Sequence, residues 1–590
     1  MSFTREAEAL LGKSMNVSDY VTRFLYTQGV RHVFVLAGGM ITYLLDSIYR
    51  DGKLTIIDTH HEQAAAFAAD AMGRITGLPG VAMATSGPGA INLLTGIGGC
   101  YFDSSPAVFI TGQVNLNEQK GIRPVRQLGF QETDIVSMAG PITKAAWRIN
   151  SPEEVPLVLS NAFTLAMSGR PGPVLIDIPM DIQRAEISAK VPPKLPSPDA
   201  NDIDQRLQKA IDELLTELRS AQRPLILVGG GIRSAHATDL FRSMVKRFKV
   251  PVVNSLMAVD ALPYTHPLRV GMIGTYGNRW ANLAIGRSDF LVVLGSRLDI
   301  RQTGSDTNAF KGNRIIYHVD CDPGEINNRV KDCRAIVADV RSFLALTLKS
   351  LKQKRFQARP EWLAEIADLK RAWPDIAELR GISGINPNEF MHALSAKSRQ
   401  AAAFVVDVGS HQMWAAQSLE LGADQRFMTS GGMGAMGFAL PAAIGASLAY
   451  PGEPIVMIAG DGGFQLNIQE FQTVVHNQLP IKMVVINNHC YGMVRQFQQS
   501  YFEGRYQSTY WGYSAPDFAR IGHAYGVASH TLDDPTKTQE ALDKMWHNPK
   551  APFILETIID TFANAFPKIA FGRPITEMEP FAKPLDIRDT

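Results

Sequence analysis

The sequence has little of several features that mark specialised proteins. Its 590 residues include only four cysteines, scattered without metal-ligand spacing at Cys100, Cys321, Cys333 and Cys490, so a reducing cytoplasm is expected. The 58 basic and 57 acidic residues nearly cancel, which leaves no basic face for nucleic acid. No apolar stretch reaches the roughly 18–20 residues that span a bilayer, and the start lacks the features of a signal peptide. We therefore expect a cytoplasmic protein that binds neither nucleic acid nor membrane.

Alternating strand and helix patterns fill most of the chain. A length of 590 residues suggests several domains, and two proline-rich or charged segments, 186–204 and 350–384, divide the chain. The pattern predicts an α/β protein with three doubly wound parallel-sheet domains, at residues 15–186, 205–350 and 385–570. The clearest predicted strands are 33–36, 81–84, 108–110, 225–228, 290–294 and 404–406.

One acid and two asparagines follow consecutive apolar runs in the last third of the chain. The run 454–459 leads into Gly460-Asp461-Gly462, and the run 481–486 leads into Asn487-Asn488. A helix is predicted between them, at 468–477, which makes a strand–helix–strand unit with parallel strands. Asp461 and Asn488 are therefore expected at the carboxyl edge of a sheet, where open α/β sheets bind ligands.

These residues have the chemistry of a magnesium–phosphate site. One carboxylate, one amide oxygen, a backbone carbonyl and water suit Mg²⁺, which prefers few protein ligands and shares the others with phosphate. Glycines allow backbone N–H groups to approach phosphate oxygens. The alternative is a pair of ordinary strand-to-helix turns.

A second acid lies at the start of a predicted helix in the first domain. Glu62 follows the predicted strand 54–58 and precedes the alanine-rich helix 64–74. A carboxylate in this position is stabilised by the helix dipole, so a simple capping role is one interpretation. The neighbouring His60 and His61 have no role that the sequence defines.

Several motifs together resemble the acetolactate synthase family of thiamine diphosphate (ThDP) enzymes. The resemblance is collinear from about residue 15 to about 570. His61–Ala66, Thr85–Asn92, Ile110–Gln113 and Gly129–Ile135 resemble the family's pyrimidine-binding domain. Gly409–Trp414, Gly431–Gly437, Leu440–Ala443, Asp461–Gly463 and Gly492–Val494 resemble its diphosphate-binding domain.

The resemblance assigns roles at the ThDP site. It implies that Glu62 activates the aminopyrimidine ring of ThDP, whose exocyclic amino group would donate to the Gly434 carbonyl. Met436 would support the bent cofactor, although simple core packing also suits a methionine. Asp461, Asn488 and the Cys490 carbonyl would bind Mg²⁺. The diphosphate and its surroundings would be lined by Gly409, Ser410, His411, Gly460, Gly462, Gly463, Tyr491, Gly492 and Met493, with a structural hydrogen bond as the alternative role of His411. Residues implied near the reacting carbon are Gly38, Gly39, Gln113, Phe130 and Gln131.

The middle domain resembles the family's flavin-binding domain. Gly229, Gly230 and Gly231 form a glycine turn after a predicted strand, and Asp320 matches an acid near the adenosine part of FAD. Arg301 matches the arginine that meets the carboxylate of the acceptor, which suits a guanidinium. FAD is therefore an expected cofactor, and a middle domain without flavin is the alternative.

Three departures from the family lie on the acceptor side. Phe497 replaces a usual tryptophan, Met180 replaces a usual lysine, and Thr275-Tyr276 replaces a histidine–methionine pair. The segment 125–132 is more similar to a branch of ThDP carboligases related to the enzyme that makes the branched sugar yersiniose. That branch transfers an acetyl unit from pyruvate to a ketone of a nucleotide-linked sugar.

The sequence therefore predicts a ThDP-dependent carboligase that decarboxylates pyruvate and transfers the acetyl unit to a carbonyl, with a ketone favoured. Phe497, Met493 and Arg301 are the predicted substrate contacts. The alternatives are an acetolactate synthase with a second 2-keto acid as acceptor, a flavin-dependent pyruvate oxidase, and a noncatalytic protein that kept the fold. The resemblance also implies a homodimer at least, with a homotetramer expected.

Overall fold

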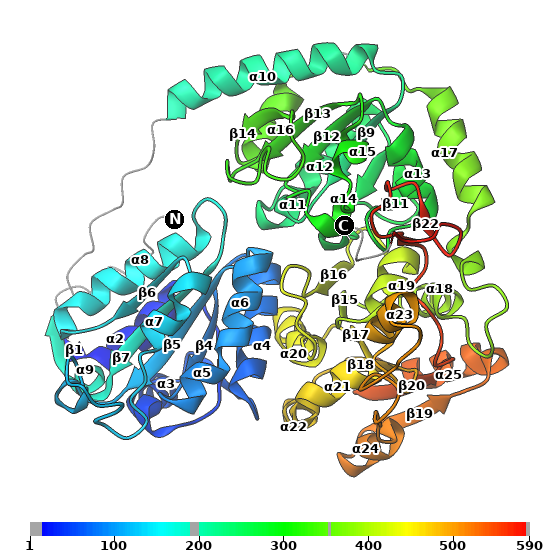
Figure 1. Ribbon diagram of the computed structural model, residues 1–590. Helices are drawn as coiled ribbons and strands as arrows, with labels where there is room; N and C mark the ends of the chain where they lie inside the picture. Colours follow the sequence, from blue (N-terminus) through cyan, green and yellow to red (C-terminus); the bar gives the residue numbers. More distant parts are fainter. Residues whose placement is uncertain (1–13, 189–199, 352–355, 586–590) are drawn as a thin grey trace. The chain divides into compact units, whose positions relative to one another are not determined.

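The protein is described by a computed structural model that covers residues 14–188, 200–351 and 356–585, with the backbone alone described at 200–204 (Figure 1). The chain forms two compact units, each built from separate segments. The first unit comprises 1–197, 430–453 and 466–481, and the second comprises 198–429, 454–465 and 482–590.

A six-stranded sheet organises the first unit, in the order β3-β2-β4-β5-β7-β6, with parallel pairing. Helices α2 (Val17–Thr27), α3 (Thr42–Asp51) and α8 (Val155–Met167) bury apolar side chains against one face. On the other side, α4 (Glu62–Thr76) packs on α6 (Leu94–Asp103) and α20 (Ala439–Ala449). The strands are β2 (His32–Val35), β3 (Thr55–Asp58), β4 (Gly80–Ala84), β5 (Ala107–Gln113), β6 (Ala145–Arg148) and β7 (Pro173–Pro179).

The second unit contains a sheet with a different order, β11-β10-β9-β12-β13-β14. Its strands are apolar on both faces, as expected of a covered parallel sheet. Ile226 and Val228 of β9 face α10 (Ala200–Ser220), α12 (Thr238–Phe248) and α16 (Val340–Ser350), while Leu225 and Leu227 face α13 (Arg279–Arg287) and α17 (Pro360–Ala372). The strands are β9 (Pro224–Val228), β10 (Val252–Asn254), β11 (Arg269–Met272), β12 (Phe290–Leu294), β13 (Ile315–Asp320) and β14 (Arg334–Val337).

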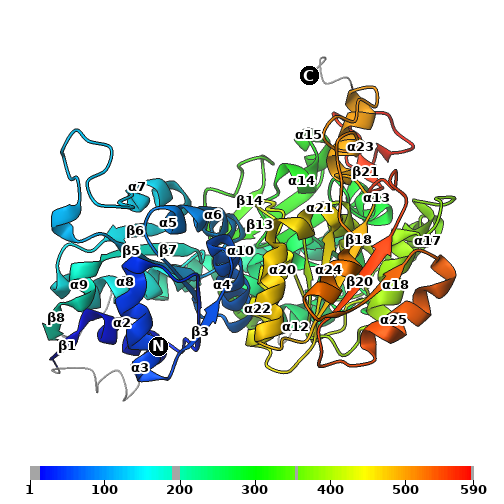
Figure 2. The ribbon, with the colours of Figure 1, turned by 90° about the horizontal axis from the view of Figure 1, so that it is seen from below.

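A third sheet, also in the second unit, repeats the topology of the first. Its order is β16-β15-β17-β18-β20-β19, so both sheets follow the pattern second-first-third-fourth-sixth-fifth. Helices α18 (Pro387–Lys397), α19 (Ser410–Ser418) and α25 (Thr538–Trp546) cover one face, and Figure 2 shows α18 and α25 beside β20. The strands are β15 (Ala403–Val406), β16 (Arg426–Thr429), β17 (Ile455–Gly460), β18 (Ile481–Asn487), β19 (Ala528–Leu532) and β20 (Phe553–Ile558).

The predicted fold class is confirmed, since three six-stranded parallel sheets alternate with helices. The predicted linker 350–384 is partly wrong, because residues 360–372 within it form α17, whose Trp362, Ile366 and Leu369 are buried against the middle sheet. The proline-rich segment 191–198 lies outside the described residues. Among the described residues no helix is both long and apolar enough to cross a membrane.

One predicted helix is interrupted. In place of a continuous helix at 468–477, the chain forms η7 (Gln465–Glu470) and then α22 (Phe471–His476). Asn467 leaves the helical region, with φ −130° and ψ 30°, and its amide donates to the Gly437 carbonyl at 2.8 Å. Asn467 directly precedes the predicted start at residue 468, so this kink bounds the predicted helix, whose first three residues form a 3₁₀ turn before α22.

Candidate functional site

In the third sheet the strand order reverses between β15 and β17, which is the position where open α/β sheets bind ligands. Both strands end in loops that the sequence analysis singled out. The loop after β15 leads through Gly409 into α19, and β17 leads directly into α21 (Asp461–Phe464). The residues predicted for metal and phosphate therefore share one edge of this sheet.

Asp461 is the buried acid of this edge. The residue is only 2% exposed, and its Oδ2 accepts a hydrogen bond from the Tyr513 hydroxyl at 2.8 Å. Burial raises the pKa of Asp461 to about 6, and the hydrogen bond from Tyr513 opposes that rise. Desolvation, followed by the neighbouring carboxylate, raises the pKa of Tyr513 well above its usual value. A cation beside Asp461 would relieve the cost of this buried charge.

Asn488 and Cys490 complete a set of oxygen ligands around Asp461. One terminal atom of the Asn488 amide lies 2.8 Å from the Cys490 carbonyl oxygen and 3.1 Å from Asp461 Oδ1. With oxygen at that position, three oxygens converge without a hydrogen between them, which fits a small hard cation. With nitrogen there, the amide donates two hydrogen bonds instead. Asn487 is different, because its amide donates to Glu556 in the core at 2.8 Å.

The donor set fits Mg²⁺ better than a transition metal. Among the described residues no group of three His, Cys, Asp or Glu side chains is arranged to hold a metal ion. One carboxylate with an amide and a backbone carbonyl is instead the sparse oxygen set of a metal that is completed by phosphate and water.

The same edge offers donors to a diphosphate. Helices α19, α21 and α23 (Gly492–Tyr501) all begin within a few residues of the ends of strands of this sheet, so their N-termini share one edge. In α21 the N–H groups of Asp461 and Gly462 donate hydrogen bonds to the Asp461 carboxylate. Ser410 Oγ and His411 Nε2 are buried without hydrogen-bond partners. Burial lowers the pKa of His411 to about 3, so its ring is neutral near pH 7. These unsatisfied groups fit an anionic ligand that approaches the loop.

Glycines keep this edge open. A Cβ on Gly462 would lie 2.3 Å from the Tyr491 ring, and a Cβ on Gly460 would lie 2.9 Å from the His411 ring. Gly463 is equally confined, because its Cβ would lie 2.8 Å from Asp407 Oδ1. Any side chain at these positions would displace the loops.

Glu62 is the buried acid of the first unit. It begins α4 and is 5% exposed, and its Oε2 accepts from the Asn92 amide at 3.0 Å. The cap of α4 comes from His61, whose Nδ1 accepts from the Gln63 N–H at 3.1 Å. The simple capping interpretation of Glu62 therefore lacks its hydrogen bond. The carboxylate instead faces α5 (Pro88–Asn92), where a Cβ on Gly89 would lie 3.0 Å from Glu62 Oε1.

The loop that carries Gly434 and Met436 is held at both ends within the first unit. Asp103 accepts from the N–H groups of Gly431 and Gly432, at 3.1 and 2.6 Å. At the other end, Asn467 donates both to the Gly437 carbonyl and to Gln63 Oε1, the latter at 3.1 Å. Gly434 has φ 69°, and Met436 is half-buried. The Gln63–Asn467–Gly437 contacts connect this loop to the first turn of the Glu62 helix.

Some residues predicted near the reacting carbon do come together. A Cβ on Gly38 would lie 2.4 Å from Thr85, and Gln131 lies over Gly87 with φ 66°. Gly39 has open space, and the Phe130 ring is 78% exposed. This group lies where the strand order of the first sheet reverses, between β2 and β4.

Gln113 is held by hydrogen bonds within the first unit. It is 1% exposed, its amide donates to the Thr133 carbonyl at 2.8 Å and to Asp177 at 3.1 Å, and its oxygen accepts from Val114. Both of its amide hydrogens are therefore used inside the fold, and its amide oxygen accepts one of the two hydrogen bonds that it can accept. Its geometry supports a structural role.

The middle sheet has the strand order of dinucleotide-binding folds, and it reverses between β9 and β12. The glycine turn after β9 offers fewer free donors than predicted, because Gly229 N–H donates to Leu294 and Gly231 N–H donates to Gly295, at 2.9 and 3.0 Å. Gly230 packs against Met257. His318 is a stronger indication of a polar ligand at this sheet. It is buried, its Nδ1 has no hydrogen-bond partner, and it lies two residues before the buried Asp320.

The predicted acceptor contacts are spread over several elements. Phe497 lies on α23 and is 43% exposed, and its ring is tilted by 48° against the rings of Tyr501 and Phe502, at 4.7 and 5.9 Å between ring centroids. Met493 is half-buried on the first turn of the same helix. Arg301 lies on α14 (Ile300–Thr303) and is exposed, while Met180 begins α9 (Met180–Arg184) in the first unit.

Tyr513 and Glu470 were not predicted as site residues, and Asn92, which lies in the Thr85–Asn92 motif, was not predicted as the partner of Glu62. Glu470 is fully buried, and its carboxylate accepts from the His60 N–H at 2.9 Å and from Thr473 at 2.8 Å. Burial raises the pKa of Glu470 to about 7. Glu470 therefore supports the turn just before Glu62. The only indication of Glu470 in the sequence was its position as an acidic residue inside a predicted apolar helix.

Comparison with known families agrees with this geometry. Three models of thiamine pyrophosphate enzymes match the chain in order. The N-terminal TPP binding domain matches residues 15–138, the central domain 211–347, and the C-terminal TPP binding domain 407–557. The two TPP binding domains thus coincide with the first and third sheets.

Relatives match over nearly the full length. The chain is 35% identical to the acetolactate synthase large subunit of Lactococcus lactis, over 96% of each chain. It is 36% identical to the isozyme 2 large subunit of Escherichia coli, over 96% of this chain and 99% of the relative, and 36% identical to the isozyme 1 large subunit, over 96% and 98%. The chain therefore belongs to the thiamine diphosphate-dependent enzymes and is acetolactate synthase-like.

Proposed function

We propose that the protein is a ThDP- and Mg²⁺-dependent carboligase that decarboxylates pyruvate and joins the two-carbon unit to a second carbonyl compound. The observation that carries the proposal is the convergence of Asp461, Asn488 and the Cys490 carbonyl beside three helix N-termini. The two buried acids, Asp461 and Glu62, have different surroundings. Those of Asp461 suit metal binding, and those of Glu62 suit proton transfer.

ThDP when bound supplies a nucleophilic carbon, C2, and a positively charged thiazolium ring that serves as the electron sink for decarboxylation. Asp461 and Asn488 would hold the metal, and Ser410 with the N-termini of α19 and α21 would bind the diphosphate. Glu62 would hold or release a proton at N1′ of the aminopyrimidine. Asn92 donates to Glu62 and fixes its orientation.

The comparison with relatives that align over nearly the whole chain supports a second 2-keto acid as the acceptor. The relatives described above are acetolactate synthases, and they align with nearly the whole chain. Arg301 is exposed and makes no ion pair among the described residues, so its guanidinium is available to a carboxylate. On this proposal the product from pyruvate alone is acetolactate.

A ketone acceptor, as in the yersiniose-related branch, is the second candidate. Two substitutions favour it: Phe497 is smaller than tryptophan and 43% exposed, and Met180 carries no charge. Both changes suit a bulkier, less anionic acceptor.

Product analysis separates the two candidates. Labelled pyruvate is supplied alone and then with a panel of uncharged ketones, and the products are identified by NMR. Acetolactate as the main product in both supports the keto-acid acceptor, whereas tertiary alcohols that outcompete acetolactate support the ketone. If CO₂ is not released under any condition, the carboligase proposal is wrong. Oxygen consumption with pyruvate would indicate an oxidase instead.

FAD is also proposed as a ligand of the middle sheet, on the basis of its strand order and the unsatisfied His318. The flavin absorption of the purified protein tests this directly. A protein reconstituted with FAD that shows no flavin spectrum after desalting would contradict it.

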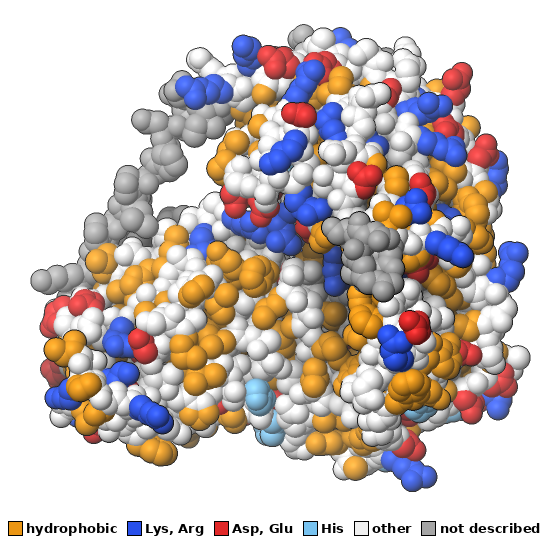
Figure 3. All heavy atoms as spheres, in the orientation of Figure 1, with side chains coloured by type: hydrophobic (Ala, Val, Ile, Leu, Met, Phe, Trp, Pro, Cys, Tyr) orange, Lys and Arg blue, Asp and Glu red, His pale blue; other side chains and the backbone are white. Residues whose placement is uncertain are grey.

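A homodimer is the smallest active unit that we propose. Apolar side chains gather on the face of the first unit over α5, α6 and α7 (Ile135–Ala139), as Figure 3 shows. Ile91, Tyr101, Phe102 and Met138 lie on these three helices and are 38–44% exposed, and exposed apolar side chains of this kind suit contact with a second copy.

Mixing two inactive variants tests whether each cofactor is shared between two chains. Dimers that combine Glu62→Gln with Asp461→Ala would contain one intact site if each site takes Glu62 from one chain and Asp461 from the other. Unfolding and refolding an equal mixture should then recover about one quarter of wild-type activity, since half of the dimers are mixed. No recovery from mixed dimers would show that each site belongs to one chain.

A further inference from the structure

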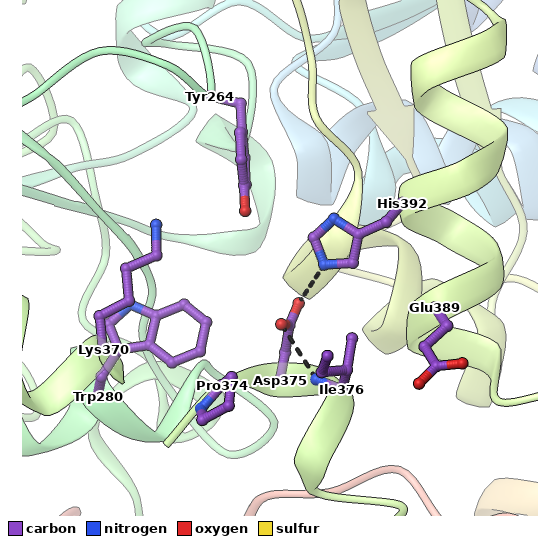
Figure 4. A pocket seen from close by; sticks show the side chains of 8 residues that line it. All are labelled: Tyr264, Trp280, Lys370, Pro374, Asp375, Ile376, Glu389 and His392. Atoms are coloured by element: carbon purple, nitrogen blue, oxygen red, sulfur yellow. Dashed lines mark hydrogen bonds and ion pairs between the residues drawn. The ribbon is translucent and has the colours of Figure 1, made fainter. Parts of the chain in front are cut away.

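The second unit contains a cavity that shares no residue with the metal, phosphate or flavin loops. Its volume is about 430 Å³, within the range of small-molecule sites. The side chains around it come from α13, α17, η6 (Asp375–Ala377), α18 and the segment before β11 (Figure 4). They are Tyr264, Trp280, Lys370, Pro374, Asp375, Ile376, Glu389 and His392.

Two acids beside this cavity are already neutralised by protein partners. Asp375 Oδ2 lies 2.9 Å from His392 Nε2 and accepts from the Ser418 hydroxyl at 2.6 Å. Glu420 contacts the other ring nitrogen of His392 at 3.0 Å and Arg399 at 3.2 Å. The carboxylates raise the pKa of His392 against the effect of burial, which favours the charged ring. The acidic side of the network therefore needs no further cation.

Two cations on the other side form no direct ion pair in the described part of the chain, although the Asp375 carboxylate acts on both from a longer distance. Lys370 Nζ lies over the rings of Tyr264 and Trp280, 5.2 and 5.7 Å from their centroids, and forms no ion pair in the described part of the chain. Arg269 packs over Tyr264 at 5.2 Å, is 9% exposed, and has a buried Nε without a hydrogen-bond partner. Lys370 is half-buried and Arg269 is buried, and a desolvated cation without an acid at ion-pair distance is costly, so this arrangement favours an anion.

The side chains that line the cavity indicate the shape and charge of the rest of the anionic ligand. Tyr264 and Trp280 present aromatic surface, and the indole N–H of Trp280 is already bound to the Val270 carbonyl at 2.8 Å. Figure 4 shows Lys370 and Trp280 on one side of the cavity and Glu389 on the other. Glu389 would repel a second negative charge, so the anionic head belongs beside Lys370 and the rest of the ligand should be uncharged.

We propose that this cavity binds a small organic anion with a carboxylate or phosphate head and a flat apolar body. The head would pair with Lys370 Nζ and accept from the Tyr264 hydroxyl, while the body would lie against the two aromatic rings. The site connects α17 to α18, so a bound ligand should also stabilise the second unit against unfolding. The proposal does not depend on the proposed enzyme activity.

Calorimetric titration of the full-length protein with three probes tests the site. Benzoate carries a carboxylate and a flat body, inorganic phosphate has an anionic head alone, and benzylamine has the body with a positive charge. Benzoate should bind saturably and raise the melting temperature. Benzylamine should not bind, and phosphate should bind at least about tenfold more weakly than benzoate because it gains no aromatic contact.

Variants locate the binding. Lys370→Met should weaken benzoate binding by at least about tenfold, whereas Lys370→Arg should retain it. Lys349→Met is the matched control, because Lys349 lies in the last turn of α16 as Lys370 lies in the last turn of α17, and it is exposed. Arg301→Met and saturating pyruvate should leave benzoate binding unchanged, which excludes the acceptor site.

Absence of benzoate binding to the wild type would overturn the proposal. Equal affinity in Lys370→Met and wild type would also overturn it, because binding would then lie elsewhere. Equal affinity for phosphate and benzoate, lost in Lys370→Met, would contradict the flat body and leave a simple anion site.

Discussion

The first and third sheets share one strand order, yet they place a buried acid in very different surroundings. Glu62 begins a helix of 15 residues and accepts from an amide, that of Asn92. Asp461 begins a helix of four residues, accepts from a phenol, and faces the oxygens of Asn488 and Cys490. The topology fixes where functional residues can lie, while the residues that follow each strand decide the chemistry.

The largest expected effect comes from the acid of the first sheet. Glu62→Gln keeps the shape of the side chain and its position beside Asn92 but cannot ionise, so turnover with pyruvate should fall about 10²–10⁴-fold while ThDP still binds. Steady-state kinetics and ThDP titration measure the two effects. Glu361→Gln, an exposed acid in the first turn of α17, is the matched control. Near wild-type turnover of Glu62→Gln would rule out its role in proton transfer.

The acid of the third sheet should control binding more than chemistry. Asp461→Ala removes the charged ligand of the proposed metal, so ThDP affinity should fall steeply and recover only in part at high Mg²⁺. Calorimetric titration of ThDP at several Mg²⁺ concentrations checks this. Unchanged ThDP affinity in the presence of a chelator would contradict the metal site.

Removing the hydrogen bond that Tyr513 donates to Asp461 should change Mg²⁺ activation by a smaller factor. Tyr513→Phe removes the 2.8 Å hydrogen bond and leaves the carboxylate in place. Residues that orient a metal ligand typically contribute about 10–100-fold to metal affinity, so Mg²⁺ activation should shift by about tenfold to higher concentration. An unchanged Mg²⁺ activation curve would show that Tyr513 has only a packing role.

The pH dependence of protein stability should reveal the buried carboxyl group of Glu470 in the first unit. Burial raises the pKa of Glu470 to about 7, so the folded protein holds a proton that the unfolded chain releases near pH 4.5. The contribution of Glu470 to unfolding free energy therefore falls as pH rises from about 4.5 to 7, by at most about 3 kcal/mol. Glu470→Gln should gain melting temperature relative to wild type between pH 5 and pH 8. A difference that does not change with pH would contradict this prediction.

The smallest predicted effect concerns the acceptor. Phe497→Trp adds surface at a position that is 43% exposed, so it should shift products by a few-fold toward acetolactate and away from ketone adducts. Competition between pyruvate and an uncharged ketone in one reaction measures the ratio. An unchanged ratio would place the acceptor away from Phe497.

The sequence was sufficient to predict the sheets and part of the site. Buried parallel strands are continuous apolar runs, so β9, β12, β17 and β18 were predicted within one or two residues. Asp461 and Asn488 could be brought together because consecutive strands of a strand–helix–strand unit end at one edge.

The remaining partners depend on contacts between distant parts of the chain. Tyr513 lies 52 residues from Asp461, and Glu470 lies 410 residues from His60, so no local pattern connects them. The glycine turn at 229–231 was predicted from its composition, but packing against the β12 loop uses two of its N–H groups. Tertiary structure, rather than local sequence, decides which polar groups remain free.

We propose above that this chain forms carbon–carbon bonds from pyruvate with ThDP as its cofactor. The most direct test is CO₂ release and product formation from carboxyl- and methyl-labelled pyruvate, with and without ThDP and Mg²⁺. We predict that both cofactors are required, and that the methyl label appears in a product with a new carbon–carbon bond. Release of CO₂ without either cofactor, or acetaldehyde or acetate as the only labelled product, would contradict the claim.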